Sequence, residues 1–359
     1  MTNRIIRIGF LGSGGIARAH VYALDALRYY YSDAPRVEKV LAASPTPAHR
    51  ESFAERFGFN EAVDPVAVWK REDLDALYIL GPNHTHTPQL LAAAEMPSVK
   101  RIYLEKPVAA SKEDLHQLEQ LDQSHPDKFI MVGFQFLQKA PIRKALAHWS
   151  SGVFGELVHF RAEYLHSSYL DPAYREKHPD RMHPIPLNGA AVDLGTHALS
   201  LLAAFIGDRL MVRAARATTG SLKDVPENAD LCTLVLLEDM ATGAVGKMMA
   251  SRTSAGTGDH LALELRGTKG TILFDTRQPD SYLSYLPDED WRRHDVYSDY
   301  RPASTFSSDY VPAGWLRALV HNHYLFLGGK PGISVIPDLA HGIQVQRLIQ
   351  QIADHLKSN

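Results

Sequence analysis

Residues 5–17 read IIRIGFLGSGGIA, and this stretch decides the fold of the N-terminal part of the chain. The apolar run over 5–11 predicts a buried strand, and the spacing G-x-G-x-x-A follows it where a helix is expected to begin. Glycines in such a turn allow a tight bend and the close approach of a pyrophosphate, and the free N–H groups of a helix N-terminus bind anions. We therefore expect a dinucleotide site that includes Gly12, Gly14, Gly15 and Ile16.

Apolar strands and helices alternate through the first third of the chain. Strands are expected over 5–11, 37–43, 75–81, 100–106 and 128–134, with helices over 15–30, 47–57, 86–95 and 111–123. This alternation indicates βαβ units and a parallel sheet that is covered on both faces. We predict an α/β fold whose first domain, over residues 1–139, is a Rossmann dinucleotide-binding domain.

The pattern changes after about residue 139. Strand-like runs dominate, over 211–218, 230–238, 243–252, 260–266 and 270–275, and the accompanying helices are expected over 141–150, 190–206, 313–328 and 337–356. Runs of strands with few helices indicate an α+β domain built on an antiparallel or mixed sheet. We expect this second domain over 140–359, with a closing helix able to pack back on the first domain.

Bulk composition excludes several classes of protein. The 359 residues include 38 Lys and Arg against 41 Asp and Glu, so the chain has no basic surface for nucleic acid. The longest apolar segment, over 198–207, is far shorter than the roughly 20 residues of a membrane-spanning helix. Cys232 is the only cysteine, which excludes an intrachain disulfide and favours a reducing compartment. We expect a cytoplasmic protein that binds neither nucleic acid nor membranes.

Two charges and a proline end the strand that is expected over 100–106. The stretch YLEKPV, residues 103–108, places Glu105 and Lys106 where the strand leaves the sheet, although charged side chains are costly to bury. Ligands of open α/β sheets bind beyond the carboxyl ends of the strands. Either the strand simply surfaces here, or it carries Lys106 to a place where a charge is needed.

A second charged pair lies on an apolar helix. The stretch NGAAVDLGTHALSLLAAFIG, residues 188–207, carries Asp193 and His197 four residues apart and hence on one face. A solvent-facing ion pair is one interpretation. Because the helix is apolar almost all round, the alternative is that both side chains are paired or line a cavity.

Five motifs occur in order along the chain: G-x-G-x-x-A, GPNHTH, EKP, DLGTH and LRGTKGTILFD. Over nearly its whole length the chain resembles the Gfo/Idh/MocA family of oxidoreductases, which includes glucose–fructose oxidoreductase and inositol dehydrogenases. The resemblance implies a C-terminal domain with a large open sheet that often mediates oligomers, here a homodimer or homotetramer. It implies that Lys106, Asp193 and His197 form the catalytic group.

The resemblance also places residues beside the cofactor. Those implied are Pro82, Asn83, His86, Glu105 and Lys106. After VGFQ the family commonly has an arginine, where this chain has Leu137, so its contacts are expected either to be made by Gln135 or Lys139 or to be absent. The pair His84 and His86 has no third ligand at a persuasive spacing, and we expect no metal site.

The choice between NAD and NADP stays open. An acidic residue usually ends the second strand of such a domain and accepts hydrogen bonds from the adenosine ribose. Ser44 stands at that position, so a 2′-phosphate would not be repelled, and Arg50 could approach it.

A long loop over 167–187 precedes the DLGTH helix and is rich in tyrosine, arginine and histidine. Long loops inside compact domains are usually functional or disordered. We expect substrate contacts from this region and from the catalytic group: Tyr164, Tyr169, Arg175, His183, Lys106, Asp193 and His197.

The implied activity is that of an NAD(P)-dependent dehydrogenase or reductase. It would transfer a hydride between the nicotinamide and a hydroxyl or carbonyl carbon of a sugar, polyol or sugar derivative. Histidine suits removal of the hydroxyl proton, and a lysine ammonium favours the developing alkoxide. Two alternatives stay open: a redox-neutral NAD-dependent glycoside hydrolase, and a catalytically silent sugar or dinucleotide sensor.

Overall fold

The computed structural model describes residues 4–186, 188–220, 222, 224–296 and 314–357. They form two compact units. The first contains 4–109, 113–138 and 314–342, and the second contains 110–112, 139–296 and 343–357. Helix α9 (Trp315–Phe326) therefore belongs to the first unit, although it follows most of the second unit in the sequence.

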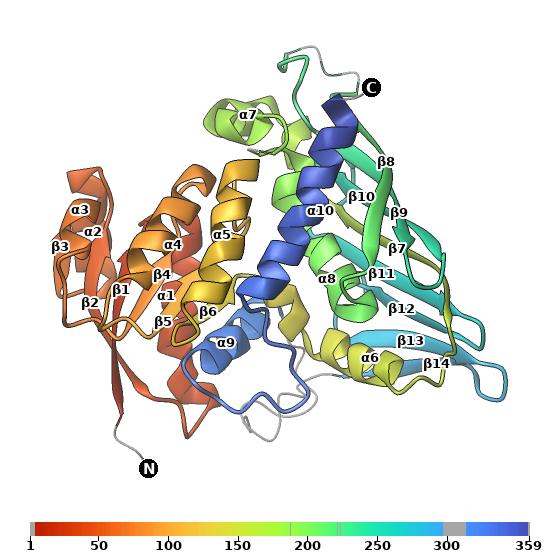
Figure 1. Cartoon of the computed structure of the whole chain (residues 1–359), viewed down its shortest axis with the longest axis horizontal. Coiled ribbons are helices and arrows are strands. Elements are labelled where there is room, and N and C mark those ends of the chain that lie inside the picture. The colour runs from red at the N-terminus through yellow and green to blue at the C-terminus, as the bar shows by residue number, and fades with distance from the viewer. Residues whose placement is uncertain (1–3, 187, 221, 223, 297–313, 358–359) are drawn as a thin grey trace. The chain divides into compact units, whose positions relative to one another are not determined.

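The first unit is built on a six-stranded parallel sheet (Figure 1). Its strands are β1 (Ile5–Leu11), β2 (Arg36–Ala43), β3 (Glu61–Val63), β4 (Ala76–Ile79), β5 (Arg101–Leu104) and β6 (Phe129–Val132). Their order is β3-β2-β1-β4-β5-β6, and each neighbouring pair is parallel. This is the strand order of a Rossmann fold, with its reversal between β1 and β4. The predicted Rossmann domain is confirmed.

Helices cover this sheet because its strands are apolar on both faces; every residue of β4 is buried. The helices of the unit are α1 (Gly15–Tyr30), α2 (Pro47–Phe57), α3 (Pro65–Val68), α4 (His86–Ala94), α5 (Lys112–Ser124) and α9. Side chains of α1, α2 and α9 share one core with β1. Helix α4 packs on β4 and β5.

The second unit is built on an eight-stranded sheet. Its strands are β7 (Leu157–Leu165), β8 (Leu210–Thr218), β9 (Cys232–Asp239), β10 (Val245–Ser251), β11 (His260–Gly267), β12 (Thr271–Asp275), β13 (Ser281–Leu286) and β14 (Asp290–Asp295). They follow the order β14-β13-β12-β11-β7-β10-β9-β8, and only the pair β7 and β10 is parallel. The predicted α+β unit with a mostly antiparallel sheet is confirmed. Strands β13 and β14 were not predicted, because their charged and aromatic residues do not alternate with apolar ones.

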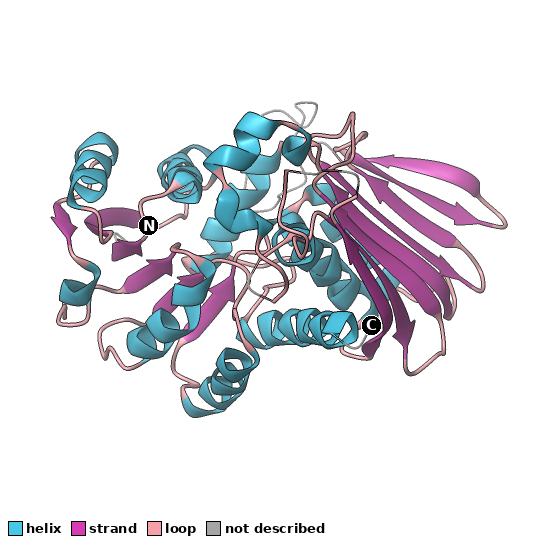
Figure 2. Cartoon of the chain, turned by 90° about the horizontal axis from the view of Figure 1, so that it is seen from above, coloured by secondary structure: helices cyan, strands magenta, loops and turns pink. Residues whose placement is uncertain are grey.

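One face of the large sheet is covered by helices and the other is open (Figure 2). Helix α8 (Thr196–Ile206) packs on β7, β10 and β11, and α6 (Ala140–Ser150) packs on β12 and β13. Helix α10 (Leu339–Lys357) is bonded to the edge strand, since Gln351 Oε1 accepts the Val212 N–H at 2.9 Å. Along β9 the buried and exposed residues alternate, as expected for a sheet with one solvated face.

Within the described part of the chain, no helix combines the length and apolar character that crossing a bilayer requires.

Two glycines of the first turn make different structural demands. Gly12 has a φ of +120°, and a Cβ there would lie 2.7 Å from the carbonyl carbon and oxygen of Leu80. Gly14 has a φ of −79°, and a Cβ there would meet nothing within 4 Å. The positive φ and the close approach of Leu80 require glycine at position 12, whereas a Cβ at position 14 would have room.

We predict that Gly12→Ala lowers the free energy of unfolding by about 1–3 kcal/mol, because the backbone must leave a conformation that only glycine adopts easily. Gly14→Ala should stay within about 1 kcal/mol of the parent, the scale of a change at a helix cap. Urea unfolding of both variants measures the difference. Equal losses of stability would show that the turn geometry is not the constraint.

Candidate active site

The glycine turn joins β1 to α1 at the point where the strand order reverses. Gly12 N–H donates to the Ala43 carbonyl at 2.8 Å, which ties the turn to the end of β2. Gly14 and Gly15 are exposed, and side-chain atoms at either would fill the open space above the turn. The first turn of α1 carries no acidic residue, so its N–H groups face no competing anion. This cradle fits a pyrophosphate group.

Ser44 follows β2 directly, and its surroundings are already hydrogen-bonded. Arg50 Nη1 donates to the Ser44 carbonyl at 3.0 Å and lies 3.3 Å from Asp64 Oδ2. The guanidinium is therefore held at the end of β2, next to the position where an adenosine ribose is expected. No acidic side chain occupies position 44, so this edge does not itself distinguish NAD from NADP.

The segment after β4 contains Pro82, Asn83 and His86. Pro82 and Asn83 are at least partly exposed at the start of a short 3₁₀ turn, Asn83–Thr85. His86 is buried, with Nδ1 2.7 Å from the Pro107 carbonyl and Nε2 3.0 Å from the Gly81 carbonyl. Burial lowers the pKa of His86, so the ring is neutral at neutral pH and donates one proton. His86 thus supports the segment that follows Lys106.

Glu105 and Lys106 follow β5, and the strand does not simply surface there. Glu105 is only 7% exposed, and its Oε1 lies 2.9 Å from His20 Nε2. Its Oε2 accepts the Lys106 N–H at 3.3 Å. Lys106 is partly exposed, and the Lys106–Pro107 peptide bond is cis. Glu105 is thus buried beside hydrogen-bond donors, whereas Lys106 lies where the chain leaves the sheet.

Gln135 and Lys139 were expected to replace a missing arginine. With its amide oriented to satisfy both ends, Gln135 donates to the Gly133 carbonyl at 2.7 Å and accepts from Trp315 Nε1 at 3.2 Å. Lys139, in the second unit, is buried, and burial lowers the pKa of its ammonium. Gln135 is therefore held by main-chain and indole partners inside the first unit.

The start of the DLGTH helix is anchored by a buried carboxylate. Asp230 Oδ2 accepts the Ala191 N–H at 2.8 Å, and Asp230 Oδ1 accepts from the Thr233 hydroxyl at 2.5 Å. The helix opens with a π-helical turn, η5 (Ala191–Gly195), and continues as α8. Such turns are frequent at functional sites. A Cβ at Gly195 would approach Met248 to 3.1 Å, so glycine allows the helix to lie close to β10.

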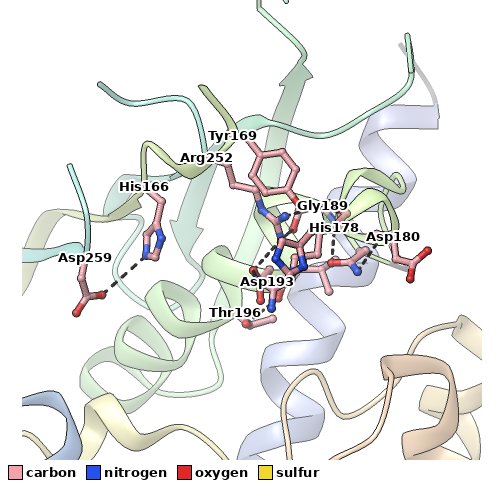
Figure 3. Close-up of polar contacts among 12 residues, drawn as sticks. His166, Tyr169, His178, Asp180, Gly189, Asp193, Thr196, Arg252 and Asp259 are labelled. Carbon is pink, nitrogen blue, oxygen red and sulfur yellow. Dashed lines mark hydrogen bonds and ion pairs between the residues drawn. The ribbon is translucent and has the colours of Figure 1, made fainter. Parts of the chain in front are cut away.

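Asp193 projects from the π-helical turn toward Arg252 (Figure 3). Arg252, which is 1% exposed, donates Nη2–H to Asp193 Oδ2 at 2.7 Å. Arg181 Nη1 lies 3.3 Å from the same oxygen, and Asp193 raises the pKa of Arg181. The Arg252 guanidinium also lies 4.8 Å from the centre of the Tyr169 ring. Asp193 is therefore a carboxylate whose position is fixed by charge-assisted hydrogen bonds.

His197 is buried one turn further along the helix, against Tyr164 of β7. The two ring centres are 5.7 Å apart in an edge-to-face arrangement. Tyr164 donates its hydroxyl to Asp259 Oδ1 at 2.7 Å, and His166 Nε2 lies 3.9 Å from that oxygen. Burial and then Asp259 raise the pKa of Tyr164 well above its ordinary value, so the phenol stays protonated.

Two residues of the loop before the DLGTH helix, Tyr169 and Arg175, are buried. Tyr169 is buried and donates to the His178 carbonyl at 3.0 Å. Arg175 is also buried, donates to the Tyr169 carbonyl at 2.6 Å and pairs with Asp224. His183 is half-exposed and lies 3.8 Å from Asp180. Tyr169 and Arg175 thus support the loop, and their expected substrate contacts stay a prediction.

Within the second unit the structure brings together Asp193, His197 and Tyr164. Within the first it brings together Glu105, Lys106 and His86, while Gln135 bonds to the Gly133 carbonyl and to Trp315. Sequence reasoning missed the partners of these residues, namely Arg181, Arg252, Asp259, His20 and His323. Arg252 follows directly after β10, and a charge at a strand end is the sequence feature that could have indicated this partner of Asp193. No group of three potential metal ligands occurs among the residues that the structure describes.

Solved structures of similar fold include dehydrogenases. Levoglucosan dehydrogenase in complex with NADH and levoglucosan matches with a TM-score of 0.87 at 24% identity, covering 99% of this chain and 98% of that one. An inositol dehydrogenase homologue from Azotobacter vinelandii, complexed with NAD+, matches with a TM-score of 0.83 at 17% identity, covering 99% and 96%. At these identities the likeness establishes the fold.

Curated relatives are similar over much of the chain. Levoglucosan dehydrogenase of Pseudarthrobacter phenanthrenivorans is 26% identical, over 97% of this chain and 95% of the relative. The NAD+-dependent scyllo-inositol 2-dehydrogenase of Bacillus subtilis is 23% identical, over 78% of this chain and 82% of the relative.

Family descriptions match both units. Residues 6–134 match the oxidoreductase family with an NAD-binding Rossmann fold, and residues 142–273 match the GFO/IDH/MocA C-terminal domain. Together the two matches cover most of the chain. The chain belongs to the Gfo/Idh/MocA family of oxidoreductases.

Proposed function

We propose that this oxidoreductase transfers a hydride between NAD or NADP and a hydroxyl or carbonyl carbon of a sugar, polyol or sugar derivative. The observation that carries the proposal is the fixed carboxylate of Asp193, held by Arg252 and Arg181 one helical turn from His197. Two relatives whose names specify sugar or polyol dehydrogenation, cited above, support the substrate class. When bound, the nicotinamide supplies the hydride acceptor or donor.

His197 would take the proton of the substrate hydroxyl as the carbon-bound hydride leaves. An imidazole exchanges protons near neutral pH and suits this task. Tyr164 packs edge-to-face against the ring, and this contact limits the orientations that the imidazole can adopt. In the reduction direction the same nitrogen would return the proton to the alkoxide.

Asp193 would orient and stabilise rather than accept the proton. Its Oδ2 already receives hydrogen bonds from two guanidinium groups, which favour the ionised form. A carboxylate held in this way stabilises positive charge that develops on a neighbouring imidazole.

Lys106 would stabilise the negative charge that develops on the reacting oxygen. It follows Glu105 at the carboxyl end of β5, where parallel sheets bind their ligands. An ammonium placed there lowers the energy of an alkoxide and polarises a carbonyl in reverse. The proposed catalytic group thus consists of Lys106, Asp193 and His197.

A redox-neutral glycoside hydrolase would use the same residues without net change of the cofactor. The two activities differ in their products. Incubation with NAD+ or NADP+ and a panel of free sugars, polyols and glycosides distinguishes them, with reduced nicotinamide and released aglycone both measured. Net formation of reduced nicotinamide supports the proposal, aglycone release without it supports the hydrolase, and binding without either product supports the sensor.

We predict that Lys106→Met lowers kcat by roughly 10²–10³-fold, the scale for losing one preorganised electrostatic donor. Dinucleotide affinity, measured by fluorescence titration, should be almost unchanged. Lys100→Met is the matched control, since Lys100 is exposed and pairs only at the surface with Asp127. Near-normal turnover of Lys106→Met at saturating cofactor and substrate would contradict the proposed role of Lys106.

We predict that Ser44→Asp weakens NADP+ binding more than NAD+ binding, because a carboxylate at this strand end repels a 2′-phosphate and accepts hydrogen bonds from a ribose. Isothermal titration with both dinucleotides measures the two dissociation constants. Ser44→Ala, which removes the hydroxyl without adding charge, is the control. An unchanged ratio of the two constants would mean that position 44 does not face the adenosine ribose.

We propose that the chain forms a homodimer or homotetramer through the open face of the large sheet. That face carries exposed apolar side chains, including Leu234 and Leu236 of β9, at 48% and 46% exposure, and Met211 of β8. Arg161 and Glu264 pair beside them on the same face. Such a mixture of apolar and paired charged groups is typical of subunit contacts.

We predict that Leu236→Lys reduces the sedimentation coefficient of the assembly to that of a smaller species, because an added charge is costly in an apolar contact. Val66→Lys changes an equally apolar residue that is 68% exposed on the first unit, and should have no effect. An unchanged Leu236→Lys assembly would place the contact elsewhere.

We also propose a cytoplasmic location. The proposal rests on the single cysteine, Cys232, whose thiol has a pKa raised by burial and is therefore poorly reactive. Fractionation of the native host cell tests it.

A further inference from the structure

Two buried histidines connect the first helix, the last helix of the first unit and the carboxylate of Glu105. His20 lies on α1 and His323 on α9, and both are fully shielded from solvent. His323 Nε2 lies 2.8 Å from His20 Nδ1, and His20 Nε2 lies 2.9 Å from Glu105 Oε1. The chain of contacts begins at the Tyr78 hydroxyl, 3.2 Å from His323 Nδ1. Four side chains from α1, β4, α9 and the end of β5 thus form one line.

One arrangement of protons satisfies every hydrogen bond in this line with all donors directed toward Glu105. In it the Glu105 carboxylate accepts from His20 Nε2, and His20 accepts at Nδ1. His323 then donates from Nε2 and accepts the Tyr78 hydroxyl at Nδ1. Burial holds the pKa of His323 well below its ordinary value, which keeps that ring neutral. Every member is satisfied, and all the donors point toward the carboxylate.

The Glu105 carboxylate contacts both His20 and the main chain at Lys106. Glu105 Oε1 receives the bond from His20, and Oε2 receives the Lys106 N–H. The carboxylate also lies against Gly133, where a Cβ would come within 2.6 Å of Oε1. The absence of a side chain at 133 leaves the room that the carboxylate needs.

We propose that His20 and His323 are positioning residues, which hold the Glu105 carboxylate and thereby fix the backbone from which Lys106 extends. The proposal rests on the function assigned above to Lys106. Neither histidine contacts the reacting atoms; each acts through Glu105. Together they make the geometry of the lysine depend on the packing of α9 against α1.

His321 provides an internal control on the same helix. It is also buried, with Nδ1 2.7 Å from the Tyr31 hydroxyl and Nε2 3.0 Å from Ser334 Oγ. Its ring packs on Tyr324, whereas that of His323 packs on Tyr103. Phenylalanine at either position keeps a ring of similar size and removes two polar contacts. The two substitutions therefore cause similar structural damage, but only one of them reaches Glu105.

The experiment compares His323→Phe, His20→Phe and His20→Gln with His321→Phe, in the full-length protein. His323→Phe and His20→Phe should lower kcat about tenfold, the factor that corresponds to one lost hydrogen bond. The KM for substrate should change much less. His20→Gln should recover most of the loss, because its amide can still donate to Glu105. His321→Phe should lower the melting temperature by a similar amount and leave kcat within about twofold of the parent, since no bond to Glu105 is lost.

A second measurement reports on Lys106 without turnover. Reductive ¹³C-methylation labels the lysines, and Lys106→Arg identifies the Lys106 signal in the NMR spectrum. The signal should shift in His323→Phe and His20→Phe and stay in place in His321→Phe. Gly133→Ala, whose added Cβ would collide with the carboxylate, should also shift the signal.

The outcomes separate the two proposals. The positioning role is overturned if the Lys106 signal stays in place in both His20→Phe and His323→Phe. It is also overturned if the signal moves equally in His321→Phe. If the parent protein turns over no sugar or polyol while the signal moves as expected, the proposed function fails and the positioning role stands. A loss of kcat in His321→Phe equal to that in His323→Phe also overturns the inference.

Discussion

Parallel strands that are buried on both faces can place polar groups only at their ends, and the first unit is organised around this constraint. The C-terminal parts of β1, β2 and β5 and the whole of β4 are apolar and buried, and each strand is followed by polar residues where it leaves the sheet. The glycine turn, Ser44, the segment around Asn83 and the pair Glu105 and Lys106 all lie at these carboxyl ends. Because the strands are parallel, the polar groups gather at one edge of the sheet. That edge is where the proposed cofactor contacts belong.

In the second unit, charged groups must be stabilised beside an almost wholly apolar helix. Asp193 is stabilised there by hydrogen bonds from Arg252, which is buried, and from Arg181, which is exposed. Asp230 serves the same helix from its N-terminal end. The site residues of each unit are therefore held by partners within that unit, so each half of the proposed catalytic group is ordered by its own fold.

Much of this could be predicted from the sequence, because periodicity is a local signal. The βαβ alternation predicted the Rossmann sheet, and the spacing of Asp193 and His197 predicted a functional helix. The partners could not be predicted, because they are brought together by tertiary contacts: His20 and His323 are 303 positions apart, and Asp193 and Arg252 are 59 apart. The burial of Tyr169 and Arg175 could not be predicted either, because the small core that their loop packs is formed with residues near position 230. His321 and His323 cannot share a helix face, and the structure uses both faces, one toward Tyr31 and one toward His20.

We propose that Lys106 and His197 act on one substrate oxygen. A crystal structure of the complex with NAD+ and a polyol that the protein oxidises tests this most directly. We predict one substrate hydroxyl within hydrogen-bond distance of both the Lys106 ammonium and the His197 imidazole, about 2.6–3.2 Å from each. A substrate bound with its hydroxyls contacting only one of these groups, or neither, would contradict the account.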